Sequence, residues 1–385
     1  MDLTLENKAC TACAKAKRRC GKQIPTCSRC TSRGISCQYP PTGRFVHPPR
    51  QTKETHFPTV QPISTSPHAL DCLDERDQTT LPWYLELSSW ELDHLPPPPY
   101  NTPICTKILD DIIEHVQEWQ IRWVNTASSP YIHRHVYKFQ TPRCVMDAFT
   151  TLSTYNHRTP ENKAIVLRLV EERICQLLAD QPEVDEDDRS STHSKLTVFE
   201  HLARVHALHI YQTIGLYDGA IRLRHVAEAQ IPTMSSWLHQ LLEAAKVAAA
   251  RGSEKFVQSI IAPRDSGPAS RFRPSDTAWY AWGFAETIRR TWFVCSCTQM
   301  VYLTLQMRWA PCPGGVMFTT CEGLWDADSA VEWESLCETL QNNRDGIDFV
   351  SRQQWDRIFD RRRPEDVDEF TTSTLDINFG SLVSC

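Results

Sequence analysis

The sequence contains no hydrophobic run long enough to cross a membrane. Its longest uncharged run, Thr291 to Met307, includes Ser, Thr and Gln and is shorter than the ~20 apolar residues that a spanning helix needs. A buried helix is the better interpretation of this run. The N-terminus also lacks an apolar signal core, because basic residues begin at Lys8. We therefore expect a chain that stays in the cytosol or nucleus and has no membrane partner.

Glycine is also scarce, with 13 glycines against 25 prolines among 385 residues. The sequence has no glycine-rich phosphate-binding loop, no G-x-S-x-G nucleophile motif and no H-E-x-x-H zinc-protease motif. These absences disfavour an enzyme, so we expect no catalytic residues. Hydrophobic residues make up 41% of the chain, which is enough for a sizeable core and excludes a wholly disordered protein.

Charge is distributed unevenly along the chain. The formal net charge is -6, but residues 1–50 contain ten basic and two acidic residues, a balance of +8. The remaining residues have a balance of -14. A basic head on an acidic body predicts a polyanionic partner, such as nucleic acid, at one end only.

Six of the 16 cysteines fall within residues 10–37, with the spacing C-x2-C-x6-C-x6-C-x2-C-x6-C. The spacing is a near-duplication of one C-x2-C-x6-C unit, and zinc prefers four tetrahedral ligands such as thiolates. Six cysteines cannot supply two zinc ions with four separate ligands each, so one sulfur from each half must bridge. Disulfides would require an exported chain. We interpret the ten scattered cysteines as small buried side chains or inert thiols.

The segment "CTACAKAKRRCGKQIPTCSRCTSRGISCQYP" resembles the fungal Zn₂Cys₆ binuclear cluster, the DNA-binding module of many fungal transcription regulators. The resemblance implies two structural zinc ions per chain. It assigns Cys10 and Cys27 as bridging ligands, with Cys13 and Cys20 completing one site and Cys30 and Cys37 completing the other. Pro25 matches the proline that is usual between the two halves of this module.

Basic residues give this cluster a positive field, with a solvated surface as the alternative interpretation: Lys15, Lys17, Arg18, Arg19, Lys22, Arg29 and Arg33. All of them except Arg33 are candidate DNA contacts. The resemblance implies that Lys17, four residues after the second cysteine, reads the guanines of a CGG triplet. It implies a phosphate contact for Arg19. Ala14 and Ala16 replace basic residues that many members carry, and a subset similar to the aflatoxin-pathway regulators also has small residues here.

The rest of the chain is predicted to be a linker, an all-α body and a tail. We place the zinc domain at residues 1–40, a disordered Pro/Ser/Thr-rich linker at 41–100, the helical body at 101–360 and an acidic-hydrophobic tail at 361–385. Apolar residues recur with helical period from Ile104 to Trp123, from Val166 to Leu178 and from Val198 to Leu208. Four stretches, including "IYQTIGLYDGAIRLR" and "WGFAETIRRTWFV", resemble the C-terminal region of secondary-metabolism regulators.

Several other motifs in the sequence each allow two interpretations. His201, His206 and His209 share a predicted helix and fit core positions better than a metal site. The aromatic and acidic segment "LPWYLELSSWELDHL" is predicted to dock on the body rather than to bind a coactivator. The similar segment "PEDVDEFTTSTLDINFGSL" has no helical period and is the better activation candidate. "KAKRR" is the better candidate for a nuclear signal than "DRRRP".

The sequence thus predicts a sequence-specific DNA-binding regulator, a nuclear activator of a secondary-metabolite gene cluster. Its expected partners are double-stranded DNA, coactivators and, through the helical body, a second copy of the chain. Three alternatives remain open at this point. The body could sense a small molecule, the protein could be a repressor, or an enzyme could be tethered to DNA.

Overall fold

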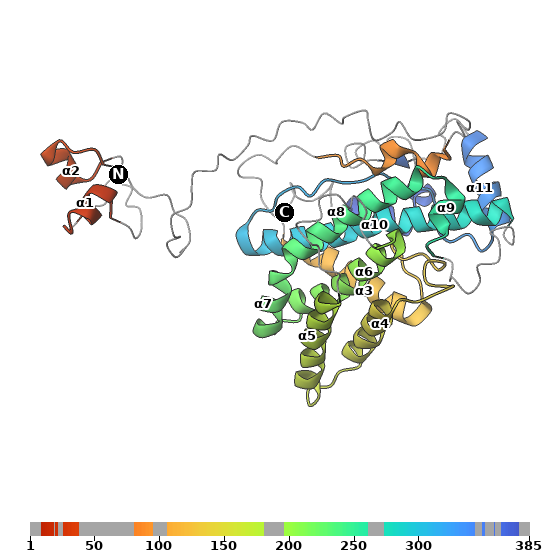
Figure 1. Cartoon of the computed structure of the whole chain (residues 1–385), viewed down its shortest axis with the longest axis horizontal. Helices are drawn as coiled ribbons and strands as arrows, with labels where there is room; N and C mark the ends of the chain where they lie inside the picture. The colour runs from red at the N-terminus through yellow and green to blue at the C-terminus, as the bar shows by residue number, and fades with distance from the viewer. Residues whose placement is uncertain are drawn as a thin grey trace. The chain divides into compact units, whose positions relative to one another are not determined.

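The computed structural model divides the chain into two compact units, Met1–Arg76 and Asp77–Cys385 (Figure 1). It describes residues 9–18, 20–21, 26–37, 81–94, 106–180, 196–260, 273–342, 349–350, 358 and 363–376. The expected linker up to residue 80 and the proline run before Tyr100 lie outside these ranges. Each unit has its own core.

The first unit contains two short helices, α1 (Thr11–Lys15) and α2 (Ser28–Arg33). Each helix begins after a cysteine whose sulfur accepts a hydrogen bond from the backbone N–H three residues later. This sulfur takes the place of the side-chain oxygen that usually caps a helix N-terminus. The two halves of the cysteine motif therefore fold in the same way.

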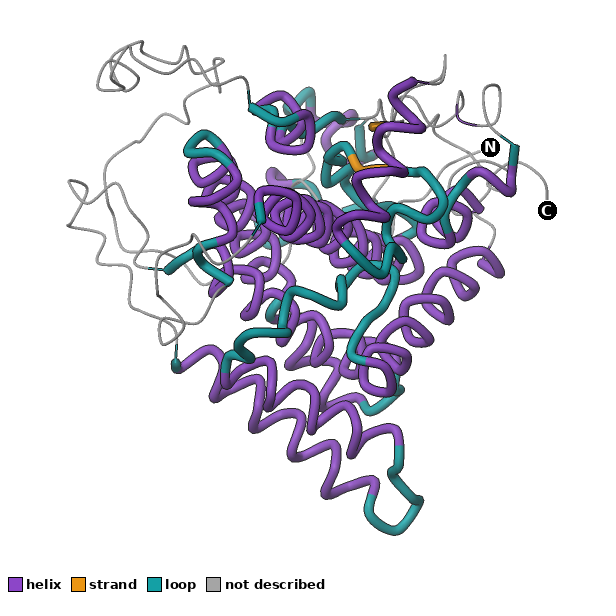
Figure 2. The backbone as a smooth tube through the Cα atoms, turned by 90° about the vertical axis from the view of Figure 1, so that its right-hand side faces the viewer, coloured by secondary structure: helices purple, strands orange, loops and turns teal. Residues whose placement is uncertain are grey.

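The second unit is a helical body, as predicted. Figure 2 shows that helices dominate its described part, and the strands β1 (Phe318–Thr319) and β2 (Phe349–Val350) form one short antiparallel pair. The α-helices of this unit are α3 (Thr106–Thr126), α4 (Arg143–Asn156), α5 (Lys163–Ala179), α6 (Val198–Tyr217), α7 (Ile221–Ala229), α8 (Ile231–Ala249), α9 (Ser253–Val257), α10 (Pro274–Met307), α11 (Ala330–Asn342) and α13 (Glu369–Asp376). The 3₁₀ helices in its described part are η2 (Trp83–Leu85), η3 (Leu87–Trp90) and η7 (Pro364–Asp366).

Helices α6 and α10 form the centre of the body. Helix α10 is a single 34-residue helix, and residues 281–299 are buried on all of its faces, which confirms a buried helix for most of the long uncharged run. Among the described residues, no helix is both long enough and apolar enough to span a membrane. The predicted stripe on α3 is buried at Ile112, Val116, Trp119 and Trp123, whereas Ile104 lies outside the described residues.

The three histidines of α6 are core residues, which confirms the preferred interpretation. His201, His206 and His209 are all buried. The His206 ring contacts the Tyr137 hydroxyl at 2.6 Å and the Thr291 hydroxyl at 2.7 Å. His209 contacts Gln120 at 3.3 Å and Thr298 at 3.1 Å. These contacts satisfy the polar ring atoms inside an apolar core.

The aromatic segment at residues 81–94 docks on the body, as predicted. Tyr84, Leu85 and Trp90 are buried. Arg289 of α10 donates hydrogen bonds to the Tyr84 carbonyl at 2.6 Å and to the Ser89 hydroxyl at 2.7 Å. Its guanidinium also lies 4.1 Å from the centre of the Trp90 ring, a favourable cation–π distance.

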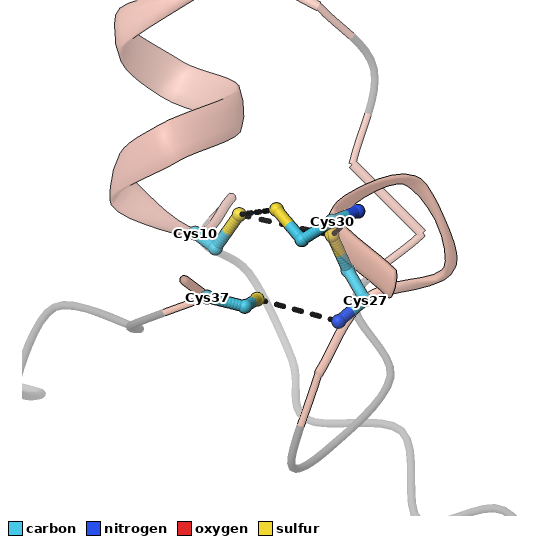
Figure 3. A group of neighbouring side chains, drawn as sticks. All are labelled: Cys10, Cys27, Cys30 and Cys37. Atoms are coloured by element: carbon cyan, nitrogen blue, oxygen red, sulfur yellow. Dashed lines mark hydrogen bonds between the residues drawn. The ribbon is translucent and has the colours of Figure 1, made fainter. Parts of the chain in front are cut away.

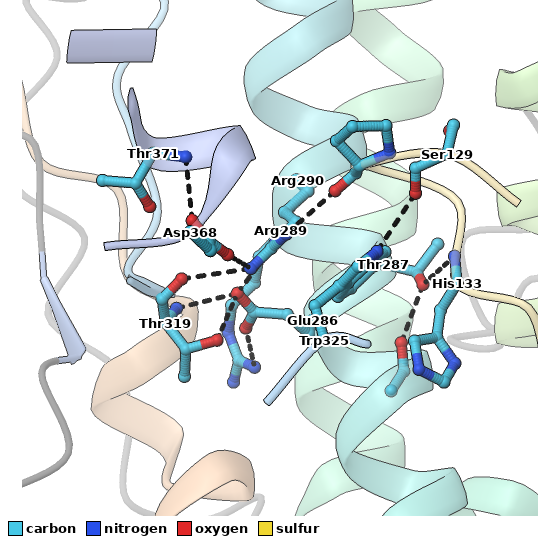
Figure 4. Close-up of polar contacts among 12 residues, drawn as sticks. Ser129, His133, Glu286, Thr287, Arg289, Arg290, Thr319, Trp325, Asp368 and Thr371 are labelled. Atoms are coloured by element: carbon cyan, nitrogen blue, oxygen red, sulfur yellow. Dashed lines mark hydrogen bonds and ion pairs between the residues drawn. The ribbon is translucent and has the colours of Figure 1, made fainter. Parts of the chain in front are cut away.

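The described part of the C-terminal segment also packs on the body and contains a helix, although its sequence has no clear helical period. Residues 369–376 form α13, and Asp368, Phe370 and Thr371 are buried. Figure 4 shows Arg290 of α10 reaching Asp368, with a Nη2–Oδ2 distance of 2.5 Å (Figure 4). The remainder of the segment, residues 377–385, lies outside the described ranges.

Candidate metal centre and nucleic-acid interface

Six cysteine sulfurs form two groups of four in the first unit. One group contains Cys10, Cys13, Cys20 and Cys27, and the other contains Cys10, Cys27, Cys30 and Cys37. Within each group the four sulfurs lie within 4.8 Å of one another. Figure 3 shows the second group, with its side chains turned toward a common centre (Figure 3). The two groups share Cys10 and Cys27.

The sulfur distances fit tetrahedral zinc. The Sγ atoms of Cys10 and Cys27 are 3.8 Å apart, and those of Cys10 and Cys30 and of Cys13 and Cys27 are 3.7 Å apart. A tetrahedron with Zn–S bonds of ~2.3 Å has edges of ~3.8 Å. These separations are far longer than the ~2.05 Å of a disulfide, and all six cysteines are free. The donor set therefore fits two zinc ions.

Backbone N–H groups orient the sulfurs, and at Cys27 they favour the thiolate form. The Cys13 and Cys30 N–H groups donate to the sulfurs of Cys10 and Cys27, each at 3.4 Å, and the Cys27 N–H donates to the Cys37 sulfur at 3.3 Å. The hydrogen bond from the Cys30 N–H is the main cause that lowers the pKa of the Cys27 thiol to about 6. Thiolate, not thiol, is the form that binds metal.

Arg29, one of the predicted DNA contacts, also contacts a metal-binding sulfur. It lies in the first turn of α2, is half-buried, and donates from Nη1 to the Cys13 sulfur at 3.6 Å. This hydrogen bond joins α2 to a sulfur of the other half of the motif. This role was not predicted from the sequence, although the position of Arg29 between Cys27 and Cys30 is a signal for it.

The exposed basic residues lie where α1 ends. Lys15, Lys17 and Arg18 are exposed, and Lys17 has a φ of 48°, in the left-handed region. This backbone turn ends α1 directly at the residue predicted to read DNA. Arg33, in the last turn of α2, is also exposed. Arg19 and Lys22 lie outside the described residues.

None of the described cysteines outside residues 10–37 belongs to either sulfur group. Cys295, Cys297, Cys321 and Cys337 are buried in the body. Among the described residues, the two sulfur groups of the first unit are the only clusters with the geometry of a metal site. This agrees with the interpretation of the other cysteines as packing residues.

Residues 8–44 match the fungal Zn(2)-Cys(6) binuclear cluster domain. Together with the sulfur geometry, this match defines the class of the protein. The chain is a DNA-binding regulator with a Zn₂Cys₆ domain that holds two structural zinc ions.

Curated relatives are fungal regulators. The chain is 24% identical over 410 residues to transcription factor gsfR2 of Penicillium aethiopicum, an alignment that covers 95% of this chain and 90% of that protein. It is 31% identical over 133 residues to the geodin cluster transcription factor of Aspergillus terreus, covering 32% of this chain and 55% of that protein. The aflatoxin biosynthesis regulatory protein of Aspergillus flavus is 48% identical over 42 residues, which cover 11% of this chain and 10% of that protein. No solved structure matches the chain.

Proposed function

We propose that this protein is a sequence-specific activator of a secondary-metabolite gene cluster and acts in the nucleus. The observation that supports this function best is the pair of four-sulfur groups that share two cysteines, next to an exposed basic helix end. A module of about 30 residues lacks a large apolar core, so bound metal supplies its folding free energy. The metal thereby fixes the position of the basic residues.

In this proposal each cysteine has one role. Cys10 and Cys27 bridge the two zinc ions, Cys13 and Cys20 complete one site, and Cys30 and Cys37 complete the other. The shared membership of Cys10 and Cys27 in both sulfur groups supports the bridging assignment. Two bridging thiolates also give each zinc four ligands from only six cysteines.

In this proposal some basic residues contact bases and others contact phosphates. Lys17 reads the guanine O6 and N7 acceptors of a CGG-like triplet from the end of α1 in the major groove. Lys15, Arg18, Arg19 and Lys22 bind phosphates, which contribute affinity without sequence preference. Arg29 contributes through its hydrogen bond to Cys13.

A DNA-binding titration tests this division. The full-length protein is titrated against one duplex with a CGG triplet and one with the triplet scrambled, by fluorescence anisotropy. Replacing Lys17 with Ala should reduce the preference for CGG by about 1–3 kcal/mol, because a base contact is lost. The exposed Lys255 on α9 is the control, and Lys255→Ala should leave both affinities unchanged. An unchanged preference in Lys17→Ala would exclude Lys17 as the reading residue.

The metabolic role rests on the relatives. Three of them carry names that refer to transcription, a geodin cluster or aflatoxin biosynthesis, and the first aligns along nearly the whole chain. Deleting the gene should lower the transcripts of a neighbouring set of biosynthetic genes. Higher transcripts would instead make the protein a repressor, and unchanged transcripts would contradict a cluster-specific role.

A further inference from the structure

The body contains a cavity of about 480 Å³ between α3, the connecting segment before α4, and α4 itself. Cavities of roughly 300–1,000 Å³ are the size that holds small organic molecules. Its described lining residues are Trp123, Ala127, Arg134, Tyr137, Lys138, Thr141, Val145, Met146, Phe149 and Thr150. The DNA-binding module is a separate unit of the chain, so DNA binding by that module does not account for this cavity.

Three aromatic rings form the walls of the cavity. Trp123 packs edge-on against Phe149 at a centroid distance of 5.2 Å and lies 6.5 Å from Tyr137. The Tyr137 hydroxyl contacts His206 of α6, and His206 in turn contacts Thr291 of α10. These buried hydrogen bonds hold the Tyr137 ring in place, so the aromatic wall is formed before any ligand arrives.

The charged residues of the cavity are both cations. Arg134 and Lys138 line it, and none of its described lining residues is acidic. Arg134 already pairs with Asp328 at 2.6 Å. Among the residues that the structure describes, Lys138 forms no ion pair, and its Nζ lies 5.9 Å from the Phe139 and Tyr280 rings. Lys138 is therefore the cation available to an anionic group of a ligand.

We propose that this cavity binds a small aromatic molecule that carries a negative charge. The aromatic part stacks among Trp123, Tyr137 and Phe149, and the anionic group pairs with Lys138. Aromatic walls favour offset-stacked or edge-to-face rings. The exposed ammonium of Lys138 attracts an anion by charge. The helical body is then a ligand-binding domain in addition to its role as part of a DNA-binding regulator.

Two fluorescent probes separate the aromatic contribution from the charge. Anilinonaphthalene sulfonate carries one negative charge, and N-phenyl-1-naphthylamine has the same rings without it. Both are titrated into the full-length protein. Lys138→Met should weaken binding of the sulfonate probe by up to about fivefold, as expected for one exposed ion pair, and should leave binding of the neutral probe within twofold.

A second variant tests the location. Thr150 is exposed on α4 at the cavity wall, and its side chain bonds only to backbone carbonyls of its own helix. Thr150→Trp should fill the cavity and abolish saturable binding of both probes, with an unchanged circular dichroism spectrum. Lys255→Met should change neither affinity. Saturable binding that survives Thr150→Trp, or an equal loss of both probes in Lys138→Met, would overturn the proposal.

Discussion

The buried ion pair between Arg290 and Asp368 should hold the C-terminal segment on the body. The two side chains are 1% and 4% exposed, and Asp368 is 78 residues away from Arg290 in the sequence. Arg290 also donates to Glu286 at 3.1 Å and to the Pro130 carbonyl at 2.9 Å. Arg289, Arg290, Glu286 and Asp368 are all buried and carry no net charge together. Removing the Asp368 charge leaves one buried positive charge without compensation, which costs roughly 3–5 kcal/mol. We therefore expect Asp368→Asn to destabilise the body by about 3 kcal/mol.

Asparagine is the informative replacement because it removes the charge and keeps an oxygen. Asp368 Oδ1 accepts a hydrogen bond from the Thr371 N–H at 2.9 Å, at the start of α13, and an asparagine oxygen can do the same. The neighbouring Glu369 gives a matched control. It pairs with Arg122 at 2.6 Å, but the two side chains are 54% and 42% exposed. Glu369→Gln should therefore cost less than about 1 kcal/mol.

Urea unfolding followed by tryptophan fluorescence measures both variants. All 12 tryptophans lie between Trp83 and Trp355, within the second unit, so the signal reports on the body alone. A loss of about 3 kcal/mol is a large share of the roughly 5–15 kcal/mol that stabilise a domain. Equal costs for Asp368→Asn and Glu369→Gln would contradict this prediction, because burial would then make no difference to the energies of the two ion pairs.

Two further predictions concern the core histidines and the metal centre. Burial, with a smaller contribution from His209, lowers the pKa of His206 to about 3 from its ordinary 6.5. His206 therefore binds a proton more readily in the unfolded chain than in the folded one. The stability contributed by neutral His206 is present above about pH 6.5 and is lost as the pH falls toward 3. When the pH falls from about 6 to 4, the free energy of unfolding in urea should decrease by about 2 kcal/mol less in His206→Gln than in the unchanged protein. Equal decreases in the two proteins would contradict this pKa shift. Arg29→Met removes the hydrogen bond to the Cys13 sulfur and should weaken zinc binding roughly 10-fold or more in a chelator competition. Arg33→Met is the control on the same helix, and equal zinc affinity in the two variants would exclude a role for Arg29 at the metal.

The sequence was sufficient to predict the metal centre because ligand spacing is local. Cys10, Cys13, Cys27 and Cys30 each lie at the start of a short helix, and the duplicated spacing brings both halves to the same geometry. Helices such as α3 and α6 were also predictable, since their apolar residues recur with helical period. The docked aromatic segment was predictable from its density of large apolar side chains.

The arrangement around α10 could not be predicted, because it depends on contacts between distant segments. Arg289 and Arg290 would be expected in water, yet both are buried and bind segments 205 and 78 residues away. Helix α13 is short and lacks an apolar stripe, so its formation depends on the Asp368 ion pair and the burial of Phe370. The cavity likewise depends on how the segment before α4 packs against α3 and α4. No local sequence pattern predicts such packing.

In the proposed function, two zinc ions held by six cysteines build the DNA-binding surface. The most direct test measures zinc content and DNA binding on the same sample of full-length protein during stepwise chelation. We predict two zinc ions per chain at the start, and a loss of binding to the CGG duplex that parallels the loss of zinc. One zinc ion per chain, or undiminished CGG binding after all zinc has been removed, would contradict the account.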